Sequence, residues 1–82
     1  MRLTFGQALD HLKEGQRVMR SGWNGKGMWL QLVEAYQVGP DKHVLGRRLL
    51  PWIGMKTADG AFVPWLASQT DMLAEDWMVL WE

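Results

Sequence analysis

The chain has 82 residues, no cysteine, and nine Lys plus Arg residues against nine Asp plus Glu residues. The absence of cysteine excludes disulfides, thiolate metal sites and cysteine nucleophiles. Because its net charge is zero, the chain lacks the broad positive field of a nucleic-acid binder. The length predicts a single domain over residues 1–82 with a small core, yet 48% of the residues are hydrophobic and six are tryptophan. This apolar excess favours a protein interface or an aromatic-lined ligand site.

A helix is the first predicted element, over about residues 5–14. Thr4 suits the N-cap position, and Gln7 three residues later completes a capping box. Four apolar residues at helical spacing define one buried face: Phe5, Ala8, Leu9 and Leu12. His11 falls on the other face, where we expect it in solvent.

Two strands follow, over about residues 16–22 and 28–35. Side chains of the second strand should alternate between the two faces of a sheet. One face is uniformly apolar: Met28, Leu30 and Leu32. The other face is mixed: Trp29, Gln31 and Val33. A mixed face of this kind is typical of a sheet that meets a partner subunit or a ligand.

A glycine-rich turn over residues 22–27 joins these strands, and its glycines allow another group to approach closely. Trp23 offers a flat face on which a base can stack. Asn24 and Gly25 offer polar groups at the bend, and Lys26 offers a cation that can meet an anion. The turn therefore favours a pocket for a flat, negatively charged ligand. The alternative is a plain hairpin turn, with Asn24 and Gly25 as its type I′ pair and Trp23 as a packing residue.

Residues 36–50 form the least regular part of the chain, and a second hairpin is predicted over residues 51–66. The Asp-Gly pair at residues 59–60 indicates a two-residue turn of type I′. Pro51 and Pro64 cannot donate ladder hydrogen bonds, so we expect them at strand ends, bulges or a sheet edge.

A short helix of two or three turns at most is predicted after Ser68, which forms a capping pattern with Asp71. Ser68, Thr70 and Asp71 could hydrogen-bond ribose hydroxyls or a phosphate, although a plain capped helix is the alternative. Residues 77–81 alternate again and indicate a final strand, with the Trp77 ring in the core. The predicted fold is therefore α+β, a small single domain whose antiparallel sheet has an N-terminal helix and a short second helix near the C-terminus.

Catalytic chemistry has weak support in the sequence. Asp71 and Glu75 are four residues apart and would share one face of a helix, where they could hold Mg²⁺ or act as acid and base. The simpler interpretation is that Asp71 caps the helix and Glu75 is solvated. We therefore predict no catalytic residue, no metal site and no cofactor, and keep a small metal-dependent cyclic-nucleotide hydrolase and a structural interaction module as alternatives.

Two segments, TFGQALDHLKEGQRVMRSGWNGKGMWL and PWIGMKTADGAFVPWLASQTDMLAEDW, resemble a family of small phage and prophage proteins, Thoeris anti-defence protein two. The resemblance covers about residues 3–33 and 50–78, while residues 36–49 match no known pattern. It implies a sponge that binds the cyclic ADP-ribose isomer made by Thoeris immune enzymes and keeps it from its effector. Some members also bind cyclic dinucleotides at a separate site.

The resemblance further implies a homotetramer with nucleotide sites between protomers, no catalysis, and action in the cytoplasm of the bacterial host. By this resemblance Trp23 would stack on adenine, Asn24 and Gly25 would make polar contacts, and Lys26 would contact phosphate. The remaining site residues implied by the resemblance are Ser68, Thr70, Asp71, Phe5 and Arg20. The absence of a signal-peptide core and of a long apolar run agrees with an intracellular, soluble protein that contacts neither nucleic acid nor membrane.

Overall fold

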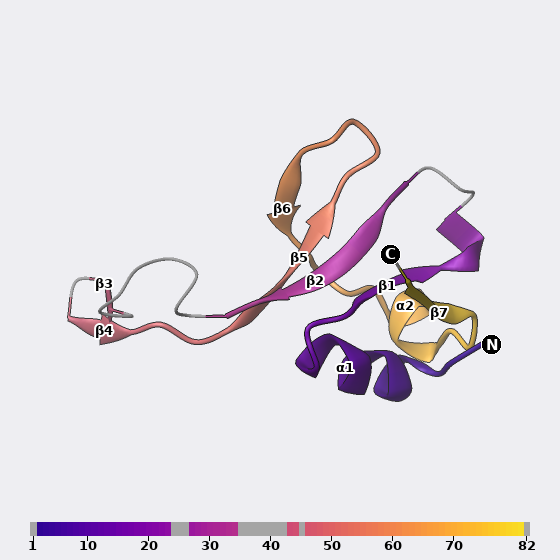
Figure 1. The fold of residues 1–82 in the computed structure, drawn as a ribbon, viewed down its shortest axis with the longest axis horizontal. Coiled ribbons are helices and arrows are strands. Elements are labelled where there is room, and N and C mark those ends of the chain that lie inside the picture. Colours follow the sequence, from indigo (N-terminus) through magenta and orange to yellow (C-terminus); the bar gives the residue numbers. More distant parts are fainter. Residues whose placement is uncertain (1, 24–26, 35–42, 45, 82) are drawn as a thin grey trace.

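The computed structural model describes residues 2–23, 27–34, 43–44 and 46–81 of the chain. The elements, in chain order, are α1 (Phe5–Lys13), β1 (Arg17–Arg20), the 3-10 helix η1 (Ser21–Trp23), β2 (Trp29–Val33), β3 (His43–Val44), β4 (Arg47–Arg48), β5 (Trp52–Lys56), β6 (Phe62–Pro64), α2 (Gln69–Leu73) and β7 (Trp77–Leu80). Five strands form one antiparallel sheet in the order β6-β5-β2-β1-β7, and β3 pairs with β4 at the end of the molecule away from α2 (Figure 1). The predicted α+β fold is confirmed.

Helix α1 begins where the sequence predicts, because its first turn is capped twice. The Thr4 side chain accepts a hydrogen bond from the Gln7 backbone N–H at 3.2 Å, and the Gln7 side chain accepts one from the Thr4 N–H at 2.9 Å. Ala8 and Leu12 lie one turn apart on the face toward the sheet, and both are fully buried. The helix is therefore fixed at its start by its cap and along its length by its apolar face.

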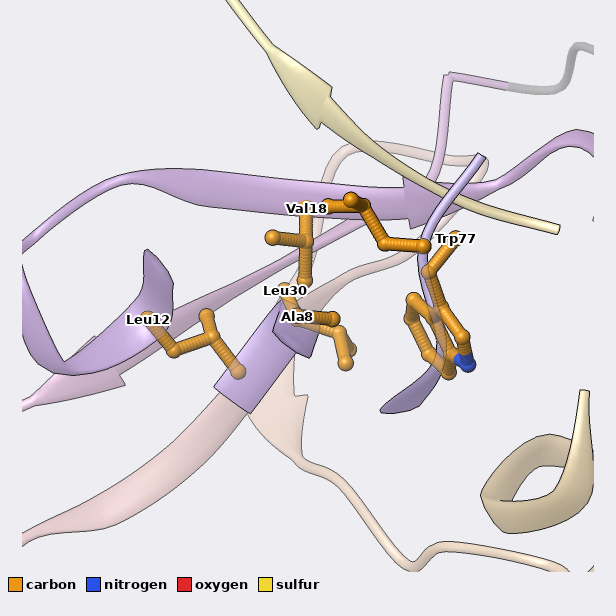
Figure 2. Packing of buried hydrophobic residues seen from close by; sticks show 6 residues of the cluster. Ala8, Leu12, Val18, Leu30 and Trp77 are labelled. Atoms are coloured by element: carbon orange, nitrogen blue, oxygen red, sulfur yellow. The ribbon is translucent and has the colours of Figure 1, made fainter. Parts of the chain in front are cut away.

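The core lies between α1 and one face of the sheet, which we call the inner face. Antiparallel partners share a face, and the pairs Val18 with Leu30 and Val18 with Val79 place these three side chains on the inner face. The fully buried members of the core come from α1, β1, β2 and β7: Ala8, Leu12, Val18, Leu30 and Trp77 (Figure 2). Leu3 joins them, and its backbone pairs with Trp77 through two hydrogen bonds of 2.8 and 3.1 Å.

The opposite surface of the sheet, which we call the outer face, carries aromatic side chains. By register it holds Arg17, Met19, Trp29, Gln31, Val33, Trp52, Gly54, Lys56, Phe62, Pro64, Met78 and Leu80. The Phe62 ring lies 6.2 Å from the Trp29 ring and 6.1 Å from the Trp52 ring. A Cβ atom on Gly54 would collide with the Phe62 ring, so glycine is required for this close approach. The mixed face predicted for residues 28–35 is thus part of an aromatic outer face.

One predicted strand boundary and one predicted turn are wrong. The strand predicted over residues 16–22 ends at Arg20, and residues 21–23 form η1 instead. The hairpin β5–β6 has a three-residue loop rather than a two-residue turn, since the Thr57 N–H donates to the Ala61 carbonyl at 2.8 Å. Gly60 takes a φ of +94° there, and its N–H donates to the Thr57 carbonyl at 3.1 Å, which is typical of a type I turn followed by a left-handed residue.

Helix α2 and the prolines agree better with the sequence. The Ser68 side chain accepts the Asp71 N–H at 3.0 Å as an N-cap, although the helix is only five residues long. Pro64 lies in β6, an edge strand, as its missing N–H requires. None of the helices in the described part of the chain is long and apolar enough to cross a membrane.

Candidate functional site

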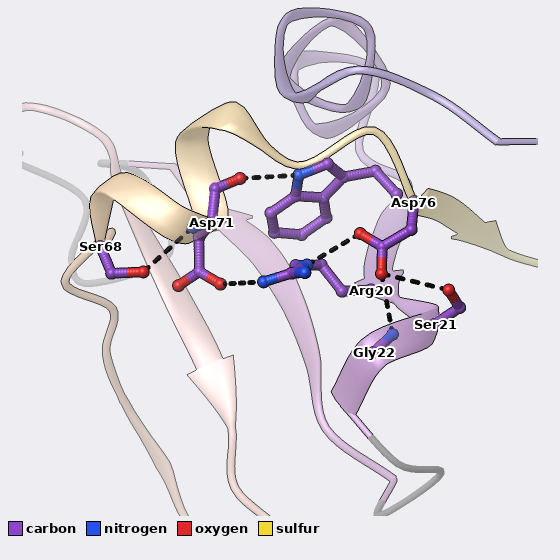
Figure 3. A network of polar contacts seen from close by, with 7 residues as sticks. Arg20, Ser21, Gly22, Ser68, Asp71 and Asp76 are labelled. Atoms are coloured by element: carbon purple, nitrogen blue, oxygen red, sulfur yellow. Dashed lines mark hydrogen bonds and ion pairs between the residues drawn. The ribbon is translucent and has the colours of Figure 1, made fainter.

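Arg20 connects two carboxylates on the inner face. Its Nε donates to Asp76 Oδ1 and its Nη1 donates to Asp71 Oδ1, each at 2.8 Å (Figure 3). The three side chains are only 16–18% exposed, so the ion pairs are largely shielded from solvent and are screened little by salt. A planar guanidinium suits this position because it can donate along two directions at once, which a lysine ammonium at the same place does not reproduce.

The second oxygen of Asp76 reaches the start of the glycine-rich turn. Asp76 Oδ2 accepts a hydrogen bond from the Gly22 N–H at 2.9 Å and another from the Ser21 hydroxyl at 3.1 Å. The Ser21 N–H also donates to the Asp76 carbonyl at 3.1 Å. A Cβ atom on Gly22 would lie 3.0 Å from Asp76 Oδ2, so the absence of a side chain lets the carboxylate come this close. Residues 21–22 are therefore fixed to the segment before β7.

These contacts shift the pKa values of both carboxyl groups. The hydrogen bond from Arg20 lowers the pKa of Asp76 most, against an opposing effect of burial, and the Gly22 N–H and Ser21 hydroxyl lower it further. Burial by itself would raise the pKa of Asp71, but hydrogen bonds from Arg20 and Ser68 bring that pKa below its ordinary value. The pKa of Arg20 is raised by its hydrogen bonds to Asp76 and Asp71. Two carboxylates and one guanidinium are thus charged at neutral pH, and the network carries one net negative charge.

Trp77 joins this polar network to the core. Its ring is fully buried, as predicted, and its Nε1–H donates to the Asp71 carbonyl at 3.0 Å. Trp23 meets the Trp77 ring edge-on at a centroid distance of 5.5 Å, and Trp65 does so at 6.0 Å. Phe5 packs on Trp77 at 5.4 Å and on Trp65 at 5.8 Å. We call these four side chains the aromatic cluster.

Five of the predicted site residues are brought together by the network and the aromatic cluster. Arg20, Ser68 and Asp71 lie around the start of α2, and Trp23 and Phe5 both pack on Trp77. Trp23 is half-buried, because its ring packs against the core.

The other predicted site residues are placed less centrally or not at all. Thr70 is exposed on α2. Asn24, Gly25 and Lys26 lie outside the described residues, as does the turn type predicted for them. Asp76 and Ser21 belong to this network but were not predicted, and the only signal for Asp76 in the sequence is an acidic segment before a predicted strand.

The arrangement of acidic residues does not match the metal-site alternative. Helix α2 ends at Leu73, so Asp71 and Glu75 do not share a helical face as that alternative requires. The Asp71 carboxylate pairs with Arg20, and Glu75 is exposed. Over residues 2–23, 27–34, 43–44 and 46–81, no group of three or more His, Asp or Glu side chains could hold a metal ion.

A cavity of about 380 Å³ lies between α1 and β7, and Leu3, His11, Met78, Val79 and Trp81 line it. His11 is half-buried there rather than in open solvent, and its Nδ1 lies 2.5 Å from Gln16 Oε1. The lining is mostly apolar and gives no sign of a charged ligand.

Comparison with known proteins identifies the family. The Thoeris anti-defense 2-like domain matches residues 3–80, which is nearly the whole chain and spans every element from α1 to β7. The chain belongs to the Thoeris anti-defense 2-like family. It is also similar to the protein Thoeris anti-defense 2 of Bacillus phage SP01, with 39% identity over an alignment of 89 positions that covers 96% of each chain. The family membership confirms the resemblance seen in the sequence and supports an anti-defence role against Thoeris.

Proposed function

We propose that the protein binds a cyclic ADP-ribose isomer and sequesters it without cleaving it, so that the signal does not reach its effector. Family membership over residues 3–80 is the observation that carries this proposal. The geometry adds a reason for the location. Trp23, on the glycine-rich turn, packs against Trp77, and the Trp77 indole N–H binds the Asp71 carbonyl of α2, the helix whose start carries the hydroxyls of Ser68 and Thr70. A purine and a ribose require these two kinds of contact.

The charges of the residues decide which part of the ligand each one contacts. The network of Arg20, Asp71 and Asp76 carries a net negative charge, so it would repel a phosphate rather than bind one. We assign the phosphate contact to Lys26, and polar contacts at the bend to Asn24 and Gly25. The Trp23 ring stacks on the base, while the Ser68 hydroxyl keeps a proton to donate after accepting the Asp71 N–H. Phe5 packs on Trp77 and Arg20 binds Asp71, so both residues help to hold these groups in position.

The same charges support sequestration over hydrolysis. A general acid needs a protonated group at working pH, whereas the lowered pKa values of Asp71 and Asp76 keep both ionised. Arg20 and the turn also engage both oxygens of Asp76, and Arg20 engages one oxygen of Asp71. We propose action in the host cytoplasm, where such nucleotide signals are made.

We further propose a homo-oligomer, a tetramer with ligand sites between protomers, in which a second copy of the chain covers the outer face. The side chains of Trp52 and Phe62 are 37% and 47% exposed on that face, beside Trp29. A chain of zero formal net charge also meets no charge repulsion against its own copy. Aromatic residues with few charges are typical of the centre of an interface.

The experiment is a retention test on the purified protein. The protein is incubated with separate cyclic ADP-ribose isomers and cyclic dinucleotides, passed through gel filtration, denatured, and the released nucleotide is identified by mass spectrometry. We expect an intact cyclic ADP-ribose isomer, at about one per site, and the same result in EDTA. Release of a cleaved or linearised nucleotide would favour the hydrolase, and retention of no nucleotide would favour a structural module. Retained cyclic dinucleotide would indicate a second ligand class.

A further inference from the structure

Asp76 joins the start of the glycine-rich turn to the start of α2, the two segments that the proposed ligand site needs, although it belongs to neither of them. Its Oδ1 accepts the Arg20 Nε–H, and Arg20 in turn binds Asp71 at the start of α2. Its Oδ2 accepts the Gly22 N–H and the Ser21 hydroxyl at the start of the turn. One carboxylate therefore uses each oxygen for a different segment (Figure 3).

The neighbouring groups make this contact specific to a carboxylate. An asparagine at this position has one acceptor oxygen, so either Arg20 or the Gly22 N–H would face the amide NH2 instead. A bulkier residue at position 22 would displace the carboxylate, since a Cβ there lies 3.0 Å from Asp76 Oδ2 and 3.4 Å from Arg20 Nη2. The acid is therefore needed for the bond between the turn and the network, and glycine at position 22 gives the carboxylate room to make it.

We infer that Asp76 is the positioning residue of the ligand site: it fixes Trp23 on the turn at a set distance from α2. This inference rests on the proposed function. Trp23 directly follows Gly22, and its ring packs at 78° to the ring of Trp77, the residue after Asp76. A turn held at Gly22 presents the ring in one orientation before the ligand arrives, so binding does not have to order it. Asp76 itself does not touch the ligand.

The test compares three variants by calorimetric titration with the cyclic ADP-ribose isomer that wild type retains, at a temperature where each variant is fully folded by circular dichroism. Asp76→Asn should weaken binding by about tenfold or more, because the turn loses its fixed orientation. Ser21→Ala removes one of the two hydrogen bonds to Oδ2 and should weaken binding by about two- to threefold. Glu75→Gln removes an exposed carboxylate next to Asp76 and serves as the matched control, with affinity unchanged.

A purely structural role would lower the melting temperature without changing the affinity of the folded protein. A folded Asp76→Asn variant that binds as tightly as wild type would therefore overturn the inference. A wild-type protein that retains no nucleotide would overturn the proposed function instead, so the two failures are distinct.

A second measurement needs no ligand. In wild type the Gly22 amide proton should shift upfield in NMR spectra as acid protonates Asp76, and this titration should vanish in Asp76→Asn. A wild-type Gly22 resonance that does not respond to acid would contradict the contact itself.

Discussion

Trp77 contributes to both the apolar core and the polar network. Its ring contacts Phe5, Trp23 and Trp65, and its Nε1–H donates to the Asp71 carbonyl. Full burial of an indole usually requires a partner for its N–H, and α2 supplies it here. The position of α2 therefore depends on a core residue, so core packing and the candidate site are not independent.

Trp23 should affect ligand binding more than stability. Stacking on an aromatic side chain contributes ~1–3 kcal/mol, so Trp23→Ala should weaken nucleotide binding by roughly 5- to 150-fold. Its half-buried ring also packs on Trp77, so we expect a stability loss of about 1–2 kcal/mol. Trp77→Ala should cost about 3–5 kcal/mol through lost burial and a cavity. Calorimetry and urea denaturation measure both quantities.

Trp81→Ala is the matched control, because its side chain is 71% exposed. It should change neither affinity nor stability by much. The assignment of Trp23 to the ligand site fails if Trp23→Ala binds the nucleotide as tightly as Trp81→Ala does.

Gly54 and Phe62 should show coupled effects on stability. Gly54→Ala places a methyl group where the Phe62 ring lies, and we expect it to destabilise the fold by about 1–3 kcal/mol. Removing the ring relieves the collision, so adding Gly54→Ala to a Phe62→Ala background should cost much less. Urea denaturation of the two single variants and the double variant gives the coupling free energy. Simple additivity would contradict the close contact.

At the scale of elements, acid should loosen the network that joins α2 to the turn. The pKa values of Asp71 and Asp76 are lowered in the folded state, against about 3.9 for an aspartate in the unfolded chain. Between these values the unfolded chain binds more protons, so stability is complete above about pH 4 and falls as the pH drops through the folded-state pKa values. The melting temperature of wild type should therefore decrease below pH 4.

Asp76→Asn removes one of the two carboxylates of the network, so its melting temperature should decrease less over the same pH range. Glu75→Gln, measured in parallel, should keep the wild-type dependence. Equal pH dependence in wild type and Asp76→Asn would show that this carboxylate is not linked to folding.

Elements whose signals are local could be predicted from the sequence, and contacts between distant segments could not. The capping box at Thr4 and Gln7, and the N-cap at Ser68, each lie within four residues, so both helix starts are confirmed. Arg20 meets acids that lie 51 and 56 residues away, and no local pattern tells which carboxylate pairs with it. The register that brings β7 beside β1 decides this pairing.

The sequence also did not predict the geometry of the turn at residues 59–60. The Asp-Gly pair at residues 59–60 predicts a two-residue turn, but the Thr57 side chain donates to Asp59 and accepts the Ala61 N–H at 3.0 Å. These side-chain contacts stabilise a longer loop than the dipeptide alone indicates. The short pair β3–β4 was also not predicted, because two residues per strand are too few to show alternation.

At the scale of the whole molecule, the two faces of the sheet differ in what covers them. Helix α1 packs on the inner face, whereas Trp52 and Phe62 on the outer face remain exposed within the described parts of the chain. Light scattering on a size-exclusion column should give an oligomer at micromolar concentration, because the exposed aromatic side chains of the outer face favour contact with a second copy of the chain. Phe62→Asp should dissociate it, because a charged carboxylate in place of an aromatic ring at the centre of an interface is costly to bury.

Leu73→Asp is the control for this prediction, since Leu73 is 78% exposed at the end of α2, away from the outer face. It should leave the oligomer intact. Wild type that elutes as a monomer, or a Phe62→Asp variant that stays assembled, would contradict the assignment of the outer face.

The hydrogen bond from the Trp77 indole to the Asp71 carbonyl makes the motion of α2 measurable. A helix of five residues is not stable by itself, so α2 depends on its cap, Arg20 and this bond. The indole proton can exchange with deuterium only when the bond opens and water reaches it, whereas the Leu30 amide in the central strand should require global unfolding. We expect the indole proton of the free protein to exchange at least about tenfold faster than the Leu30 amide. Its rate would report how often α2 leaves the body of the fold, and slower exchange with nucleotide bound would identify α2 as part of the structure that the ligand closes.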